Sequence, residues 1–220
     1  MQKIQAILFD MDGVLVFSEP FWREAEHKIF KERFNIELTE EDVNQSTGLK
    51  TTEVVNMHMS KYGFTCDLSE IGHEIEKEVV RLVYERGEPM DGLRELTEWI
   101  KEKGWRRCLV TSSSQYVYES IVRFVGLDDY FERKFTAYDE EWGKPHPAVY
   151  HSAINYLGLA KEDIIVIEDS MNGVKAAYAA GLKILGLPEQ HNRSNEIYNS
   201  MILNSFQSHN EILNYLKSNC

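Results

Sequence analysis

Short apolar runs that alternate with helical patterns constrain the fold of this chain more than any other feature. Residues 4–9, 107–110, 164–167 and 183–187 are apolar, short and followed by polar or turn residues, which predicts strands. Apolar residues at helical spacing fall between or beside these runs, and most of the helical stretches end at a glycine. This alternation predicts an α/β fold, a parallel sheet with helices on both faces.

Residues 21–87 differ from the rest because they show helical patterns without intervening strands. Residues 39–42, Thr-Glu-Glu-Asp, resemble a capping box, and an apolar stripe at helical spacing runs from Leu68 to Leu82. We therefore predict a helical domain inserted after the first strand. The expected division is a core of residues 1–16 and 88–220 and an insertion of residues 17–87.

Charge and cysteine content narrow the classes of partner and compartment. The net charge of −12 disfavours a nucleic-acid backbone or an anionic membrane as a partner. The first apolar run ends at Asp10 and is too short for a signal peptide or a membrane span. The three cysteines lie far apart, without the spacing of a disulfide framework or a zinc site. We expect a cytoplasmic protein, and a monomer, since no extended apolar interface is evident.

Polar residues suited to phosphate chemistry follow three of the predicted strands, and a lysine lies in a loop between two of them: Asp10 and Asp12, Thr111 and Ser112, Glu168 and Asp169, and Lys144. Ligands of open α/β sheets bind at the carboxyl ends of the strands, so these side chains would converge on one rim. In isolation each has an ordinary interpretation as a turn, a helix cap or a surface lysine. The joint pattern favours an active site.

A carboxylate at this rim can attack phosphorus and divide a slow hydrolysis into two easier displacements. Asp10 fits that role, and Asp12, two residues on and near the same centre, can act as general acid and base. Mg²⁺ prefers oxygen ligands, which Asp10, the Asp12 backbone carbonyl and Asp169 could supply, with Glu168 reaching the ion through water.

Three further residues could bind the transferred phosphoryl group. Thr111 can donate its hydroxyl to the phosphoryl oxygens, and the backbone N–H of Ser112, just before a predicted helix, adds a second donor. Lys144 can neutralise the negative charge that Asp10 and the phosphoryl group share.

The ordered motifs resemble those of the haloacid dehalogenase superfamily. Residues 9–15, Phe-Asp-Met-Asp-Gly-Val-Leu, followed by residues 18–20, Ser-Glu-Pro, resemble its first motif. Thr111, Lys144-Pro145 and residues 168–173, Glu-Asp-Ser-Met-Asn-Gly, match its second, third and fourth motifs in order. The resemblance covers nearly the whole chain and implies a Rossmann-like core with a helical cap between the first two motifs.

The same resemblance implies roles for particular residues. The nucleophile of the family would be Asp10, its acid and base Asp12, and its metal-site carboxylates Glu168 and Asp169. The presence of Asp12 argues against a dehalogenase, which lacks that second carboxylate.

Within the superfamily, the chain is most similar to the branch of β-phosphoglucomutase and the sugar-phosphate phosphatases. The mutase has an arginine shortly after the glycine of the cap and a lysine-asparagine pair after the second motif. Thr51 and Ser114-Gln115 stand at those places here, which favours hydrolysis. Residues 18–22 and 47–50 look like the 2-deoxyglucose-6-phosphate and hexitol-phosphate phosphatases. Phe17 stands where relatives commonly have aspartate, which puts the hinge behaviour of cap closure in doubt.

Four residues are weaker candidates for contact with the substrate. Trp22 could stack on it or simply pack in its helix, and Glu19 could bind a sugar hydroxyl or favour the helix N-terminus. Lys50, where relatives more often have arginine, could reach the substrate or stay solvated. Ser113 could contact the substrate or only water.

We therefore predict a Mg²⁺-dependent phosphatase that hydrolyses a small phosphorylated metabolite, a sugar or sugar-alcohol phosphate, through an aspartyl-phosphate on Asp10. Two alternatives stay open at this point. One is a phosphomutase of the β-phosphoglucomutase type, and the other is a non-catalytic binding protein on the same fold, because fold does not fix function.

Overall fold

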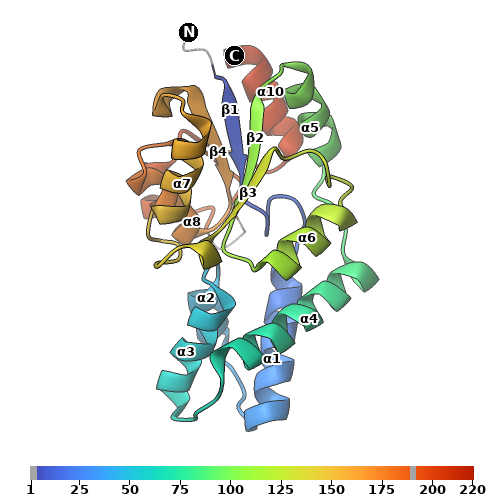
Figure 1. Cartoon of the computed structure of the whole chain (residues 1–220), viewed down its shortest axis with the longest axis vertical. Helices are drawn as coiled ribbons and strands as arrows, with labels where there is room; N and C mark the ends of the chain where they lie inside the picture. The colour runs from blue at the N-terminus through green and yellow to red at the C-terminus, as the bar shows by residue number, and fades with distance from the viewer. Residues whose placement is uncertain (1–3, 189–191) are drawn as a thin grey trace.

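The computed structural model describes residues 4–188 and 192–220, in which a parallel sheet of six strands forms the centre of the upper part of the molecule (Figure 1). The strand order is β3-β2-β1-β4-β5-β6, and all neighbours pair in parallel. The strands are β1 (Ala6–Phe9), β2 (Arg106–Thr111), β3 (Arg133–Thr136), β4 (Ile164–Glu168), β5 (Lys183–Gly186) and β6 (Asn204–Ser205). The predicted α/β fold is confirmed.

The four central strands β1, β2, β4 and β5 lie where the apolar runs predict them, with small differences at the ends. The sequence pattern does not predict the edge strands β3 and β6. β3 has the sequence Arg-Lys-Phe-Thr, with one large apolar residue, and β6 is two residues long. An edge strand is paired and covered on fewer sides than a central one, so it can form without an apolar run.

Successive residues of β1 face opposite sides of the sheet, and each side has its own hydrophobic core. Ile7 and Phe9 belong to one cluster, and Ala6 and Leu8 belong to the other. Both faces are therefore covered, as predicted. Helices α5 (Leu93–Glu102), α6 (Gln115–Phe124) and α10 (His209–Asn219) contribute to the first cluster, and α7 (Ala148–Leu157), α8 (Met171–Ala179) and α9 (Glu196–Met201) contribute to the second.

Four helices without strands form the lower part of the molecule (Figure 1). They are α1 (Glu19–Phe34), α2 (Glu40–Ser46), α3 (Thr51–Tyr62) and α4 (Leu68–Arg86), called here the helical insertion. The long helix α4 packs against both α1 and α3. The two connections to the sheet domain lie side by side, since the backbone N–H of Met90 donates to the carbonyl oxygen of Leu15 at 3.0 Å and Val16 pairs with Pro89.

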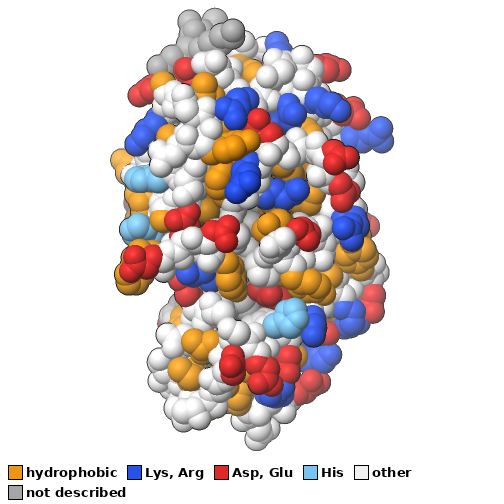
Figure 2. Space-filling model, viewed as in Figure 1, with side chains coloured by type: hydrophobic (Ala, Val, Ile, Leu, Met, Phe, Trp, Pro, Cys, Tyr) orange, Lys and Arg blue, Asp and Glu red, His pale blue; other side chains and the backbone are white. Residues whose placement is uncertain are grey.

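On the face shown in Figure 2, acidic and basic side chains are interspersed among polar and apolar ones rather than gathered by sign. This face therefore has no continuous basic stripe of the kind that follows a nucleic-acid backbone. Across residues 4–188 and 192–220, no helix combines the length and the apolar character needed to cross a bilayer.

The predicted capping box at the start of α2 is confirmed and extends into a larger polar cluster. Thr39 Oγ1 accepts from the backbone N–H of Asp42 at 3.2 Å, and the Asp42 carboxylate accepts from the backbone N–H of Thr39 at 2.8 Å. Lys61 Nζ and Tyr62 Oη, on α3, donate to the same carboxylate at 2.5 and 2.6 Å. Burial alone would raise the pKa of Asp42, but these hydrogen bonds outweigh burial and hold its pKa well below the usual range.

We expect Asp42→Asn to lower the free energy of unfolding at neutral pH by about 1–3 kcal/mol, because α2 and α3 lose their charged link. The folded-state pKa lies below the unfolded value of about 4, so this stabilisation is present above that pH and is lost as the pH falls through the folded pKa. Urea unfolding of the wild type and of Asp42→Asn should give free energies of unfolding whose difference becomes smaller as the pH is lowered into the acid range. Glu41→Gln, at an exposed neighbouring position, is the matched control and should change little. A gap independent of pH would contradict the electrostatic origin.

Candidate active site

The register of the parallel strands brings three strand ends to one level at the rim of the sheet. Phe9 of β1 pairs with Leu109 of β2 on one side and with Ile167 of β4 on the other. The backbone N–H of Asp10 donates to the carbonyl oxygen of Ile167 at 3.0 Å, which continues the ladder by one residue. The polar residues that follow these strands therefore meet, as predicted, on the side of the rim that faces the helical insertion.

Lys144 joins these three strand ends. Its Nζ donates to Asp10 Oδ1 at 2.8 Å, to Glu168 Oε1 at 2.6 Å and to the backbone carbonyl oxygen of Val110 at 3.1 Å. Only 2% of Lys144 is exposed, so these contacts replace its hydration. Lys144 is therefore fully buried and uses all three of its N–H donors at the ends of β1, β2 and β4. Its sequence context alone suggests a surface lysine.

The carboxylate of Glu168 is surrounded by donors on every side. Oε1 accepts from Tyr150 Oη at 2.9 Å as well as from Lys144, and Oε2 accepts from the backbone N–H groups of Asp169 and Ser170 at 3.1 and 3.3 Å. Tyr150 was not predicted as a site residue. Its place in an apolar stripe predicts a core side chain, and the hydroxyl that holds Glu168 has no separate sequence signal.

The carboxylates of Asp10, Glu168 and Asp169 could hold a metal ion together. Each offers an oxygen, and these oxygens lie within 4.8 Å of one another in a buried position. An all-oxygen donor set of this kind fits Mg²⁺, which binds few protein carboxylates and retains waters. Both Glu168 oxygens accept hydrogen bonds in this structure, one of them from Lys144.

Two glycines allow the carboxylates to come this close. Gly13 has φ of +70°, and a Cβ there would lie 1.9 Å from Asp169 Oδ2. A Cβ at Gly173 would lie 1.8 Å from Glu168 Oε1. Any other residue at either position would displace a carboxylate of the site, which gives both motif glycines a physical reason.

Burial and the neighbouring charge of Glu168 raise the pKa of Asp10 to about 8 in the metal-free protein, although Lys144 opposes the shift. Burial would lower the pKa of Lys144, but the charges of Asp10 and Glu168 outweigh it and keep its pKa above the usual range. The cluster therefore holds more negative charge than Lys144 neutralises, which is the condition under which a cation is bound.

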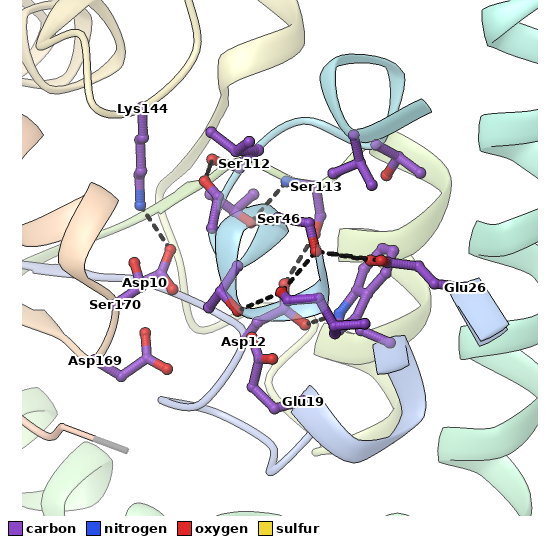
Figure 3. A pocket seen from close by; sticks show the side chains of 18 residues that line it. Asp10, Asp12, Glu19, Glu26, Ser46, Ser112, Ser113, Lys144, Asp169 and Ser170 are labelled. Carbon is purple, nitrogen blue, oxygen red and sulfur yellow. Dashed lines mark hydrogen bonds and ion pairs between the residues drawn. The ribbon is translucent and has the colours of Figure 1, made fainter. Parts of the chain in front are cut away.

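Asp12 is held by three donors from different parts of the chain. Oδ1 accepts from Ser18 Oγ at 2.5 Å and from Trp22 Nε1 at 2.8 Å, and Oδ2 accepts from Ser113 Oγ at 2.8 Å. Sequence reasoning assigned Trp22 and Ser113 to possible substrate contact and did not single out Ser18. In this structure all three donate to Asp12, and Figure 3 shows Ser113 beside it, while substrate contact by Trp22 and Ser113 stays a prediction.

The rim and the helical insertion enclose a cavity of about 50 Å³, which is room for only a few water molecules. Ser112 Oγ donates to the carbonyl oxygen of Gly48 at 2.8 Å, and Asn172 Nδ2 donates to that of Thr47 at 2.9 Å, so the insertion rests directly on the rim. The predicted site residues that line the cavity are Asp10, Asp12, Glu19, Trp22, Thr111, Ser112, Ser113, Lys144 and Asp169.

Two predicted residues do not line the cavity. Glu168 lies behind its wall, fully buried. Lys50 Nζ lies 3.4 Å from Glu53 Oε1 in an ion pair. A part of Lys50 in substrate binding stays a prediction. Thr111 is buried at the rim, and its Oγ1 accepts from the backbone N–H of Ser113 at 3.0 Å.

The raised pKa of Asp10 can be tested through the pH dependence of protein stability. In a buffer with a chelator, folded Asp10 keeps its proton up to about pH 8, whereas in the unfolded chain it loses the proton near pH 4, so the folded state loses stability as the pH rises from about 4 to about 8. We expect Asp10→Asn to be more stable than the wild type there by about 1–3 kcal/mol, read from thermal melts. Asp129→Asn, an exposed carboxylate, should show no such gain. Equal stability of Asp10→Asn and wild type at high pH would contradict the assigned charge imbalance.

Known proteins share sequence and fold with nearly the whole chain. It is 29% identical over 215 residues to a phosphorylated carbohydrates phosphatase of Thermotoga maritima, covering 97% of this chain and 99% of that protein. It is 28% identical over 189 residues to hexitol phosphatase B of Escherichia coli, covering 85% of each. The solved structure of CbbY from Rhodobacter sphaeroides in complex with phosphate has a TM-score of 0.85, covers 95% of this chain and 96% of its own, and at 24% identity shows the shared fold. Residues 4–181 match the haloacid dehalogenase-like hydrolases, and the chain belongs to this family.

Proposed function

We propose that this hydrolase is a Mg²⁺-dependent phosphatase for a small phosphorylated metabolite, of the sugar or sugar-alcohol phosphate class. The observation that carries the proposal is the buried Lys144, whose Nζ lies 2.8 Å from Asp10 and 2.6 Å from Glu168 at the rim of the sheet. The relatives named as phosphatases of phosphorylated carbohydrates and hexitols support the substrate class.

Asp10 is the proposed nucleophile. An oxygen of its carboxylate attacks phosphorus, the bond from phosphorus to the ester oxygen breaks, and the electron pair leaves on that oxygen. Asp12 donates a proton to the leaving oxygen. In the second step Asp12 takes a proton from a water, the water oxygen attacks the phosphorus of the aspartyl-phosphate, and inorganic phosphate leaves with Asp10 restored.

The surroundings of Asp10 support this role. Lys144 fixes one carboxylate oxygen and places a positive charge where the phosphoryl group gathers negative charge. Thr111 and Ser112 line the same cavity as Asp10. They offer the hydroxyl and backbone donors predicted to bind the phosphoryl oxygens. Mg²⁺, held by Asp10, Asp169 and the backbone of Asp12, would supply charge neutralisation for the phosphoryl group.

The helical insertion, residues 17–87, is proposed to act as a cap. A cavity of about 50 Å³ is small for a sugar phosphate, which supports a motion of the insertion away from the rim as the substrate enters. Ser18 and Trp22, at the start of the insertion, donate to Asp12, so the position of the cap and the orientation of the acid and base change together. Phe17 lies in the connection with 54% of its surface exposed.

Neither alternative function is favoured by an observation of this structure. A mutase must bind a second phosphate, yet Lys144 is the one cation among the described residues that line the cavity. Thr51, at the place of the mutase arginine, lies 3.2 Å from Glu76 and is buried. A non-catalytic protein would not need to bury a charge-imbalanced cluster of this cost.

The activity itself is the first test. We expect release of inorganic phosphate from sugar-alcohol phosphates that needs Mg²⁺, stops with a chelator and resumes when Mg²⁺ is restored. Asp10→Asn should lower kcat by about a thousandfold or more, because the amide is not a nucleophile. Asp129→Asn should keep wild-type activity. A fully active Asp10→Asn would rule out this mechanism.

The role of Trp22 can be separated from stacking by a conservative change. Trp22→Phe keeps an aromatic ring and removes the N–H that donates to Asp12, together with the smaller ring of the indole that carries it. We expect kcat to fall by about threefold to tenfold, because Asp12 is less well oriented, with KM little changed. The control is Trp142→Phe, at an exposed tryptophan outside the cavity. A raised KM with unchanged kcat would instead indicate substrate stacking.

A further inference from the structure

The wall that the helical insertion contributes to the cavity carries negative and apolar side chains but no positive one. Among the described residues that line the cavity, the insertion supplies Glu19 and Glu26 together with Trp22 and small polar and aliphatic residues. Lys144 belongs to the opposite wall and is already held by Asp10 and Glu168. The part of the substrate that faces the insertion therefore meets carboxylates.

Glu26 is the more deeply buried of the two. It lies on α1, is 4% exposed, and its carboxylate reaches toward Ser46 at the end of α2 (Figure 3). Val43 and Val54 line the same wall, so water has little access to the carboxylate. A carboxylate in such a position needs hydrogen-bond donors, since an uncompensated buried charge is strongly destabilising.

The protein supplies too few donors to this carboxylate. Ser46 Oγ lies 3.2 and 3.4 Å from the two Glu26 oxygens but 2.8 Å from the backbone carbonyl oxygen of Val43. A hydroxyl has one hydrogen to donate, so Ser46, which also lies close to the Val43 carbonyl oxygen, gives the Glu26 carboxylate at most one hydrogen bond. A carboxylate can accept about four hydrogen bonds. Most of the acceptor capacity of Glu26 is therefore left to a molecule in the cavity.

His58 provides an independent sign that this corner is incomplete. It lies on α3, is fully buried, and its Nε2 is 3.8 Å from Glu26 Oε2, too far for a hydrogen bond. Neither ring nitrogen has a hydrogen-bond partner among the described residues. Its ring packs against Phe30 in a T-shaped contact, with ring centroids 4.8 Å apart. A buried polar side chain without a partner calls for an explanation, and a ligand that engages Glu26 supplies one.

We propose that Glu26 is a specificity-determining residue that accepts hydrogen bonds from hydroxyl groups at the end of the substrate remote from the phosphate. Ser46, with its Oγ 3.2 Å from the carboxylate, and His58, with its Nε2 3.8 Å from it, are the polar side chains beside Glu26 and act as positioning residues. The enzyme thereby selects a neutral, polyhydroxylated end and rejects an end that carries a carboxylate or a second phosphate. This inference rests on the proposed phosphatase activity and narrows its substrate class.

The preference for a hydroxylated end follows from the negative charge of Glu26 and from the number of hydrogen-bond donors that the substrate brings to it. A hydroxyl brings the donor that Glu26 lacks, whereas a carboxylate or phosphate brings only acceptors and a like charge into a buried place. Like charges in a site that excludes water repel far more strongly than in bulk solvent. A site built to exchange hydrogen bonds with a substrate discriminates sharply against an analogue that cannot complete them.

Glucitol 6-phosphate and 6-phosphogluconate form a matched pair for the test, because they differ only in a terminal CH₂OH or carboxylate. For wild-type enzyme with Mg²⁺, we expect kcat/KM to favour glucitol 6-phosphate by about tenfold or more. Glu26→Gln removes the charge and keeps the shape, and the preference should fall to within about threefold, chiefly through KM. Glu24→Gln is the control, because Glu24 lies on the same helix with its side chain 48% exposed.

Thermal melts establish that each variant is folded, and His58→Gln gives a second, independent variant. It should raise KM for glucitol 6-phosphate by about threefold or more and leave kcat near that of the wild type, a split that general destabilisation does not produce. Wild-type preference for 6-phosphogluconate, or a preference for glucitol 6-phosphate that survives both Glu26→Gln and His58→Gln, overturns the inference while the phosphatase activity stands. If the wild type releases phosphate from neither compound, this result counts against the proposed function itself.

Discussion

The ammonium of Lys144, buried between Asp10 and Glu168, is the interaction on which the rest of the structure depends. It lies within hydrogen-bond distance of both carboxylates and of the backbone of β2, so it joins the ends of β1, β2 and β4 at the rim of the sheet. Tyr150 completes the surroundings of Glu168 from α7. The strand order and register place the cation here, and the chemistry proposed for Asp10 requires it to be here.

The electrostatics of the molecule work against a phosphorylated substrate at long range and for it at short range. The chain has a net charge of −12, which repels phosphate in solution. At the rim, Lys144, a bound Mg²⁺ and backbone donors would reverse the sign locally. On the opposite wall, Glu26 keeps the field negative. The cavity therefore has a positive end at the rim and a negative end at Glu26. Such an arrangement suits a molecule with a phosphate at one end and hydroxyls at the other.

Much of this could be predicted from the sequence because the signals are local. Apolar runs located β1, β2, β4 and β5, and the residues that follow them supplied Asp10, Thr111 and Glu168. What could not be predicted depends on contacts between segments far apart in the chain. Tyr150 looks like a core residue, and its hydroxyl matters only because α7, packed against β2 and β3, brings it within hydrogen-bond distance of Glu168 at the end of β4. Trp22 was interpreted as a packing or stacking residue, but its N–H donates to Asp12, and Glu26 and His58 gave no signal at all.

The most direct measurement of covalent phosphoryl transfer is acid quenching during turnover of a sugar-alcohol phosphate, followed by mass spectrometry of the peptide that contains Asp10. The expected result is one phosphoryl group on Asp10 that forms before phosphate is released and is lost on brief exposure to alkali, as an acyl phosphate is. Steady release of phosphate with Asp10 unmodified at every time point, or a stable phosphoryl group on Thr111 or Ser112, would contradict the role of Asp10.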